Sequence, residues 1–333
     1  MNNIQDFKKK FDEEIEQYLE SKINYAKKID AKGVLLFRII KEFIKNGGKR
    51  LRPAIFYYSY LSYLNTNTDN IFRLSFAFEL FHTFALIHDD IIDKSVLRRN
   101  KLTVHKKYGL ETAILAGDLA LVLADEIFFD QLNHLNLVQL QRLRTTNLFN
   151  RFKQELIIGE HLDYLKIDNV QKIMELKTAR YSFVKPATLA FTLAEVNNKE
   201  ILFWQETLNR TGVLFQIKDD YLGTFGDVKK IGKPIKSDFE EGKNTLIIKL
   251  FKERAAIWEL KKFDEFFGRS NVKEKDFTWF VGLLEKKGIK KDIILSINRE
   301  AECLLKKIDR VSTKNKYLEK IVREILISLR EPS

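Results

Sequence analysis

The stretch FRLSFAFELFHTFALIHDD, residues 72–90, decides the fold class. Its apolar residues recur with the spacing of a helix, and the alternation typical of a strand is missing from it. The run leads into three aspartates within five positions, Asp89, Asp90 and Asp93, and two arginines follow at 98 and 99. The segment therefore predicts a long apolar helix with an acidic end.

The rest of the chain repeats this helical pattern. A second run, TLNRTGVLFQIKDD at residues 207–220, has the same spacing and also ends in aspartates. Helix breakers are scarce, with 4 Pro and 14 Gly in 333 residues, and no linker divides the sequence. Gly47 and Gly48 mark one break, before a helix opened by Pro53, and residues 225–245 read as a long basic loop. We expect an all-α chain with a single domain, residues 1–333.

Cysteine content and hydropathy indicate the cellular compartment of the protein. Cys303 is the only cysteine, so one chain cannot build a disulfide framework. The N-terminal residues lack an apolar signal core, and the longest apolar stretch, 113–129, is interrupted by Asp118, Asp125 and Glu126. These features predict a cytoplasmic protein with no transmembrane segment.

The net charge of +12 admits a nucleic-acid binder as one class of function. The lysines are scattered along the whole chain, with acidic residues nearby in most places. This distribution is more typical of a soluble surface than of a binding stripe, so we expect anionic substrates and no nucleic acid.

The first acidic motif has the spacing of a metal site. On a helix, His82, Asp89 and Asp93 stand at i, i+7 and i+11 and share one face. Two carboxylates one turn apart suit Mg²⁺, which prefers oxygen ligands and commonly joins one or two carboxylates to a phosphate. The alternative is a solvated acidic helix end, which the apolar residues before it make less favourable.

A second acidic pair and a set of cations complement the first motif. Asp219 and Asp220 close the second apolar helix, so two acidic ends facing across a cavity would clamp a diphosphate through several Mg²⁺ ions. A basic cluster would bind a second diphosphate without metal, since Arg and Lys both suit phosphate oxygens. The cations in question are Lys49, Arg50, Arg52, Arg98 and Arg99. A solvated patch at a helix start is the alternative for the first three.

Taken together, the segments GGKRLRP, HTFALIHDDIID, LRR, TVHKKYG and AILAGD resemble those of the trans-isoprenyl diphosphate synthases, the polyprenyl synthetase family. The archaeal short-chain synthases that make geranylgeranyl diphosphate are the most similar in motif. The resemblance implies an isoprenoid-synthase bundle of long helices around a central cavity, as a homodimer. It also implies a Mg²⁺-dependent transferase, with up to three ions, that condenses isopentenyl diphosphate with an allylic diphosphate to give geranylgeranyl or farnesyl diphosphate.

The resemblance also assigns site residues. Isopentenyl diphosphate would be held by Lys49, Arg52, His82 and Arg99, and metal by Asp89, Asp93 and Asp219. The allylic diphosphate would contact Arg98, Lys177, Thr178, Gln216, Lys233 and Lys243. The catalytic set would be Asp89, Asp93, Arg98, Lys177 and Asp219, and product length would depend on Phe81, Phe84 and Ala85.

The sequence departs from the family pattern at three positions. Gly223 stands where many relatives have a third aspartate, Asn100 where a glycine usually follows the arginine pair, and Glu160 where relatives often carry glutamine. His88 and Asp118 are expected to be structural.

Two further functions stay open. A class I terpene cyclase shares the first acidic motif but needs no second diphosphate site, and a non-catalytic subunit of a heteromeric synthase tends to lose the acidic motifs.

Overall fold

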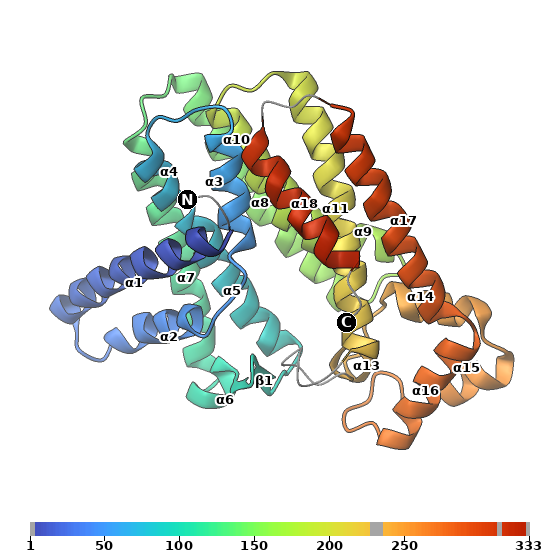
Figure 1. The fold of residues 1–333 in the computed structure, drawn as a ribbon. Helices are drawn as coiled ribbons and strands as arrows, with labels where there is room; N and C mark the ends of the chain where they lie inside the picture. Colours follow the sequence, from blue (N-terminus) through green and yellow to red (C-terminus); the bar gives the residue numbers. More distant parts are fainter. Residues whose placement is uncertain (1–3, 227–235, 312–314, 331–333) are drawn as a thin grey trace. The chain divides into compact units, whose positions relative to one another are not determined.

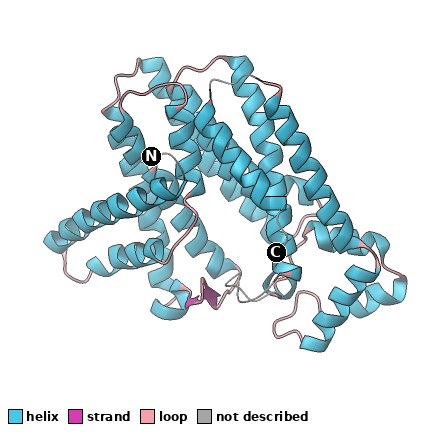
Figure 2. Cartoon of the chain, in the orientation of Figure 1, coloured by secondary structure: helices cyan, strands magenta, loops and turns pink. Residues whose placement is uncertain are grey.

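The computed structural model describes residues 4–226, 236–311 and 315–330, and it is helical almost throughout these ranges (Figure 2). Contacts along the chain divide it into two compact units. Unit 1 comprises residues 1–153, 185–202 and 313–321, and unit 2 comprises residues 154–184, 203–312 and 322–333. The all-α prediction is confirmed. The assignment of residues 1–333 to a single domain stays a prediction.

Unit 1 contains the first part of the helical chain (Figure 1). Its elements are α1 (Ile4–Ile29), α2 (Val34–Lys45), α3 (Leu51–Leu61), α4 (Thr68–Leu74), α5 (Phe76–Ile92), β1 (Leu97–Arg98), β2 (Lys101–Leu102), α6 (Val104–Tyr108), α7 (Leu110–Asn133), the start of α8 (Gln139–Tyr164), α10 (Lys185–Leu193) and the starts of α11 (Asn198–Phe225) and α18 (Lys316–Arg330). The helix after the double glycine begins two residues before Pro53, so the predicted break is confirmed.

The closest helix pair in unit 1 is α5 with α7. Alanines at 113, 116, 120 and 124 and Gly117 line the buried side of α7. Because these side chains are small, the two backbones approach closely. An aromatic cluster of Phe7, Phe11, Phe72 and Phe76 packs around the start of α5, with ring centroids 5.0 Å apart for Phe11 and Phe76. These contacts hold α5, which carries the first acidic motif, in the core.

Unit 2 holds the second acidic motif. Its elements are the end of α8, α9 (Val170–Met174), a π-helix η1 (Glu175–Val184), most of α11, α13 (Ser237–Glu240), α14 (Leu246–Arg254), α15 (Ile257–Asp264), α16 (Glu274–Lys286), α17 (Ile289–Asp309) and the end of α18. Phe239 joins α13 to α14, α15 and α16 through a buried cluster of rings, with its centroid 4.8 Å from that of Phe280. The described residues after 252 are mostly helical, in agreement with the all-α prediction.

Two local expectations were wrong. Strands were not expected, yet β1 and β2 pair as an antiparallel hairpin of two residues each. The stretch 225–245 was expected to be loop throughout, yet Ser237–Glu240 forms a short helix. Residues 227–235 of that stretch lie outside the described residues.

One described stretch, Thr68–Ile92, is long and apolar enough to cross a membrane, with a mean hydropathy of 1.2. However, 72% of its most apolar 18-residue window is buried inside the protein, as in the core helix of a globular unit, so it is weak evidence for a membrane span.

Candidate active site

The first acidic motif occupies the C-terminal end of α5. The helix ends at Ile92, and Asp93 caps it. Asp89 and Asp93 are one turn apart and half-buried, whereas Asp90 is 1% exposed. The helix that the sequence predicted therefore presents the two expected carboxylates together and turns the third into the protein.

Arg98 binds the buried aspartate. Its Nε donates to both carboxylate oxygens of Asp90, at 2.9 and 2.8 Å, and its terminal nitrogen donates to Asp89 at 3.2 Å. Burial alone would lower the pKa of Arg98, but the hydrogen bond and charge of Asp90, then Asp89 and Asp93, outweigh burial and raise it. The repulsion among the three aspartates is therefore offset in part by a side chain of the protein itself.

The hairpin after α5 fixes where the arginines stand. Arg98 pairs with Lys101 across β1 and β2, and the two-residue turn is Arg99–Asn100. Both turn residues have left-handed backbones, with φ of 53° and 61°, as a type I′ turn requires. Asparagine tolerates this conformation better than most residues, which explains why it can replace the expected glycine at 100.

Arg99 is anchored to the loop after α2. Its guanidinium donates to the carbonyl oxygen of Gly47 and lies over the ring of Phe43, 6.0 Å from the centroid. Gly48 has φ +138°, and a Cβ there would lie 2.8 Å from an Arg50 nitrogen and 3.2 Å from an Arg99 nitrogen. The backbone conformation therefore favours glycine at 48, and its missing side chain leaves room for the two guanidinium groups.

Arg50 is a structural residue. Its side chain is 1% exposed, and it donates to Asp12 at 2.6 Å, to Glu79 at 2.5 Å and to the Ile44 carbonyl at 2.6 Å. These bonds hold Arg50 in a left-handed conformation with φ 49°. Its place in the predicted phosphate-binding cluster was therefore wrong, because its donors are directed into the protein. Lys49 is exposed and Arg52 half-buried, as a substrate-facing pair would be.

His82 lies on α5, about two turns before Asp89 and about three turns before Asp93. Burial, followed by the charges of Arg52, Arg99, Arg98 and Arg50, lowers its pKa well below the ordinary value. The imidazole is therefore neutral at neutral pH and is surrounded by cations. The structure thus brings together the predicted His82, Arg52, Arg98 and Arg99 within unit 1.

His88, for which a structural role was expected, lies against α7 and beside Asp118. His88 Nε2 lies 3.3 Å from the carbonyl oxygen of Ile114 and 3.6 Å from Asp118. A Cβ at Gly117 would overlap the imidazole ring, so glycine at this position lets α5 seat against α7.

The residues assigned to product length have different surroundings. Phe81 is fully buried, with its ring centroid 5.1 Å from that of Phe152. Phe84 and Ala85 are half-buried, and the Phe84 ring lies 5.4 Å from that of Phe81 and 4.7 Å from that of His88. Phe84 is therefore the ring that has an exposed side, while Phe81 supports it from the core.

In unit 2, a chain of hydrogen bonds joins η1 to the second acidic motif. The Thr178 hydroxyl donates to Gln216, and the Gln216 amide donates to Asp220 at 2.8 Å. Burial, then the Asp238 carboxylate, raises the pKa of Asp220 well above its ordinary value, although the Gln216 bond opposes this shift. Asp219 is more exposed than Asp220. The end of α11 therefore resembles the end of α5, with one aspartate buried and another accessible.

Lys177 is held by two carboxylates of α8. Its ammonium nitrogen lies 2.6 Å from Glu160 Oε2 and 2.5 Å from Asp163 Oδ2. The sequence singled out Glu160 as a departure but gave no partner for it, and it did not indicate Asp163. Their three-residue spacing indicates that the two carboxylates share one face of α8, but it does not indicate that Lys177 binds both of them.

The basic loop ends in a further ion-pair cluster. Lys243 lies 2.7 Å from Glu241 and 3.8 Å from Asp238, and its backbone nitrogen donates to the Asp238 carbonyl at 2.9 Å. A Cβ at Gly223 would lie 3.1 Å from an Asp238 oxygen. An acidic group therefore lies beside the position where an aspartate was expected. Lys233 lies outside the described residues.

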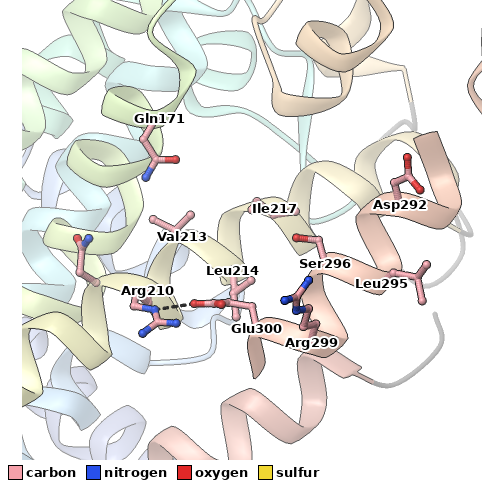
Figure 3. Close-up of a pocket in the computed structure, with 11 residues that line it drawn as sticks. Gln171, Arg210, Val213, Leu214, Ile217, Asp292, Leu295, Ser296, Arg299 and Glu300 are labelled. Atoms are coloured by element: carbon pink, nitrogen blue, oxygen red, sulfur yellow. Dashed lines mark hydrogen bonds and ion pairs between the residues drawn. The ribbon is translucent and has the colours of Figure 1, made fainter. Parts of the chain in front are cut away.

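The two acidic motifs belong to different units, so their facing arrangement stays a prediction. A cavity of about 640 Å³ within unit 2 lies beside α11, against α17 and α9, and contains none of the predicted site residues (Figure 3). Its wall includes Arg210, which is paired with Glu300 at 2.6 Å. In the described part of the chain, groups of three or more His, Cys, Asp or Glu arranged to hold a metal are not found.

Comparison with known proteins defines the class. The sequence model of polyprenyl synthetase matches residues 34–284, and the chain belongs to this family. A short chain isoprenyl diphosphate synthase from Methanocaldococcus jannaschii is 29% identical over 282 residues, covering 83% of each chain. A geranylgeranyl pyrophosphate synthase from Geoglobus acetivorans is 32% identical over 249 residues, covering 72% of this chain and 74% of that one.

Comparison with a solved structure supports the same family for the fold. The geranylgeranyl pyrophosphate synthase from Corynebacterium glutamicum, complexed with isoprenyl diphosphate and magnesium, superposes with a TM-score of 0.89. It is 25% identical, and the match covers 99% of both chains.

Proposed function

We propose that this protein is a short-chain trans-prenyltransferase that condenses isopentenyl diphosphate with an allylic diphosphate. The product is geranylgeranyl diphosphate, farnesyl diphosphate or both, and inorganic diphosphate is released. The observation that carries the proposal is the end of α5. There, two half-buried carboxylates one turn apart follow a neutral histidine surrounded by arginines, in a chain of the polyprenyl synthetase family.

The residues present fit Mg²⁺. Asp89 and Asp93 offer oxygen ligands on one helix face, and Asp219 offers a third on α11. Mg²⁺ keeps several waters and shares a substrate phosphate, so a site with two protein carboxylates is sufficient and a preformed cluster of three is not needed. When bound, up to three ions would neutralise charge on the allylic diphosphate as it departs.

The reaction separates charge and then joins two carbon skeletons. Breaking the allylic C–O bond leaves a resonance-stabilised cation and a diphosphate, whose growing charge is stabilised by the cationic groups of the site. The double bond of isopentenyl diphosphate attacks the cation, forming a C–C bond. A proton then leaves the new cation, and the departing diphosphate accepts it. Water must be excluded throughout, because it would quench the cation.

The side chains divide between two diphosphates. Isopentenyl diphosphate would be bound by Lys49, Arg52, His82 and Arg99, and a neutral His82 can donate one hydrogen bond while accepting another. The allylic diphosphate would be bound by Arg98, Lys177, Thr178, Gln216, Lys233 and Lys243. In this division Arg98 has two tasks, because it also holds Asp89 and Asp90.

The proposal also covers the oligomeric state of the protein and the extent of its functional domain. On α7, Leu115, Val122 and Phe129 are 55%, 59% and 37% exposed and recur every seven residues, which places them along one face. A second copy of the chain covering this apolar stripe would form a homodimer. The family match runs through segments of both units, which supports residues 1–333 as one functional domain. We propose the cytoplasm as its compartment.

Substitution of the first acidic motif tests the proposal. Asp89→Asn and Asp93→Asn should each lower the steady-state rate with saturating Mg²⁺ by orders of magnitude, because charge stabilisation of the leaving group is lost. Asp69→Asn is the matched control, since the Asp69 side chain is 89% exposed and belongs to the same unit. Near-normal rates for both motif variants would contradict the assignment of Asp89 and Asp93 to catalysis.

A further inference from the structure

Two ion-pair contacts join α8 to η1 within unit 2. In one, the Lys177 ammonium lies between Glu160 and Asp163, at 2.6 and 2.5 Å. In the other, Arg180 lies 3.2 Å from Glu155. Only the first of these contacts contains a residue proposed to bind diphosphate, Lys177. The second contact can therefore serve as a control for substitutions in the first.

The first pair is enforced by close packing. A Cβ at Gly159 would lie 2.9 Å from Leu176 Cβ and 3.2 Å from Lys177 Cγ, so the backbone of α8 approaches η1 at this point. Glu160 and Asp163 are three residues apart on α8 and reach the same ammonium. The Lys177 side chain is 19% exposed, so its ion pairs with the two carboxylates are largely shielded from solvent.

The charges of this group sum to −1, from one ammonium and two carboxylates. An ammonium has three N–H donors, and two of them point at carboxylates here. A diphosphate oxygen that binds Lys177 must therefore compete with these carboxylates for the ammonium donors. Glu160 is the more easily displaced of the two, because its side chain is 24% exposed and that of Asp163 is 15% exposed.

We propose that Glu160 sets the affinity of the allylic-diphosphate site by competing with the diphosphate for the Lys177 ammonium, while Asp163 positions the lysine. The inference rests on the proposed function, which makes Lys177 a diphosphate ligand. A glutamine at 160 would keep an oxygen acceptor beside Lys177 and remove the competing charge. Weaker binding of diphosphate also favours its release after each condensation.

The experiment compares Glu160→Gln with wild type in two measurements. Calorimetric titration of inorganic diphosphate in the presence of Mg²⁺ should give a Kd lowered roughly three- to fivefold, the size expected for a partly exposed ion pair. The KM for geranyl diphosphate should fall by a similar factor, and the KM for isopentenyl diphosphate should not change. Glu155→Gln, which removes the same charge from the same helix, should leave all three values unchanged.

A second variant separates competition from a general change of charge. In a Lys177→Met background, Glu160→Gln should no longer tighten inorganic diphosphate, because the lysine transmits its effect. An unchanged or raised Kd in Glu160→Gln would overturn the proposal, as would an equal effect of Glu155→Gln. If wild type fails to condense the two substrates, the proposed function fails instead. The titration does not depend on turnover, so the two failures are distinguishable.

Discussion

At the scale of single residues, Arg50 and Arg52 show how two neighbours of one type come to differ. The guanidinium of Arg50 is enclosed by Asp12, Glu79 and backbone carbonyls, whereas Arg52 lies among the cations around His82. The segment GGKRLRP could not reveal this, because the carboxylates that bind Arg50 lie far away in the sequence. Composition and spacing predict the cluster, and long-range contacts decide which member is structural.

Replacing Arg50 should therefore mainly affect stability, whereas replacing Arg52 should mainly affect substrate binding. Arg50→Met should lower the free energy of unfolding by about 3–5 kcal/mol, because it leaves the buried Glu79 carboxylate without its partner. Arg52→Ala should raise mainly the KM for isopentenyl diphosphate, with little loss of stability. Denaturant unfolding and steady-state kinetics on both variants provide the check. A stable Arg50→Met protein, or an Arg52→Ala enzyme impaired only toward the allylic substrate, would contradict the division.

His82 predicts a pH dependence of stability. Its pKa is lowered in the folded protein, so below about pH 6.5 the unfolded chain binds a proton that the folded chain resists. Stability from this residue is present above that pH and is lost as the pH falls, by at most about 1.4 kcal/mol per pH unit. Urea unfolding of wild type and His82→Gln at pH 7.5 and pH 5.5 measures the difference. If both proteins lose equal stability on acidification, His82 is not the group responsible.

At the scale of elements, α5 connects the metal ligands to the rings assigned to product length. Helical spacing in residues 72–90 predicts both the helix and its acidic end, because scarce breakers and periodic apolar residues are local properties. The hairpin at 97–102 was missed, since two-residue strands are too short to show alternation. The π-helix η1 was missed as well, because the shift from α to π bonding depends on what packs against it.

The register of α5 yields a prediction on product length. The allylic chain should grow along α5 away from Asp89, and Ala85 and Phe84 are the first side chains it meets, about one turn below. Phe84→Ala should shift the products to chains longer than geranylgeranyl while activity survives, because the half-buried ring is removed. Product chains are sized by chromatography from geranyl and farnesyl starters. An unchanged distribution in an active, folded variant would place the floor elsewhere.

Phe81→Ala is the contrasting variant. Phe81 is fully buried against Phe152, so its truncation should cost stability, about 3–5 kcal/mol as for other core phenylalanines.

At the scale of the whole molecule, the chain has two compact units with one acidic motif in each. Within each unit, the structure shows which carboxylates are turned inward, Asp90 and Asp220, and which stay accessible, Asp89, Asp93 and Asp219. The sequence could predict the motifs, the helical class and the family. It could not predict the partners Glu160, Asp163 and Asp238, because each is brought to its lysine or aspartate by folding alone.

In the most direct measurement, the full chain is incubated with isopentenyl diphosphate, geranyl diphosphate and Mg²⁺. The prenyl diphosphate products and the released inorganic diphosphate are both quantified. We expect linear geranylgeranyl diphosphate as the favoured product, with farnesyl diphosphate beside it, and one inorganic diphosphate released for each isopentenyl diphosphate consumed. Chelating the metal should stop the reaction. A cyclised hydrocarbon formed without isopentenyl diphosphate, or no consumption of either substrate by the folded wild-type protein, would contradict the assignment as a prenyltransferase.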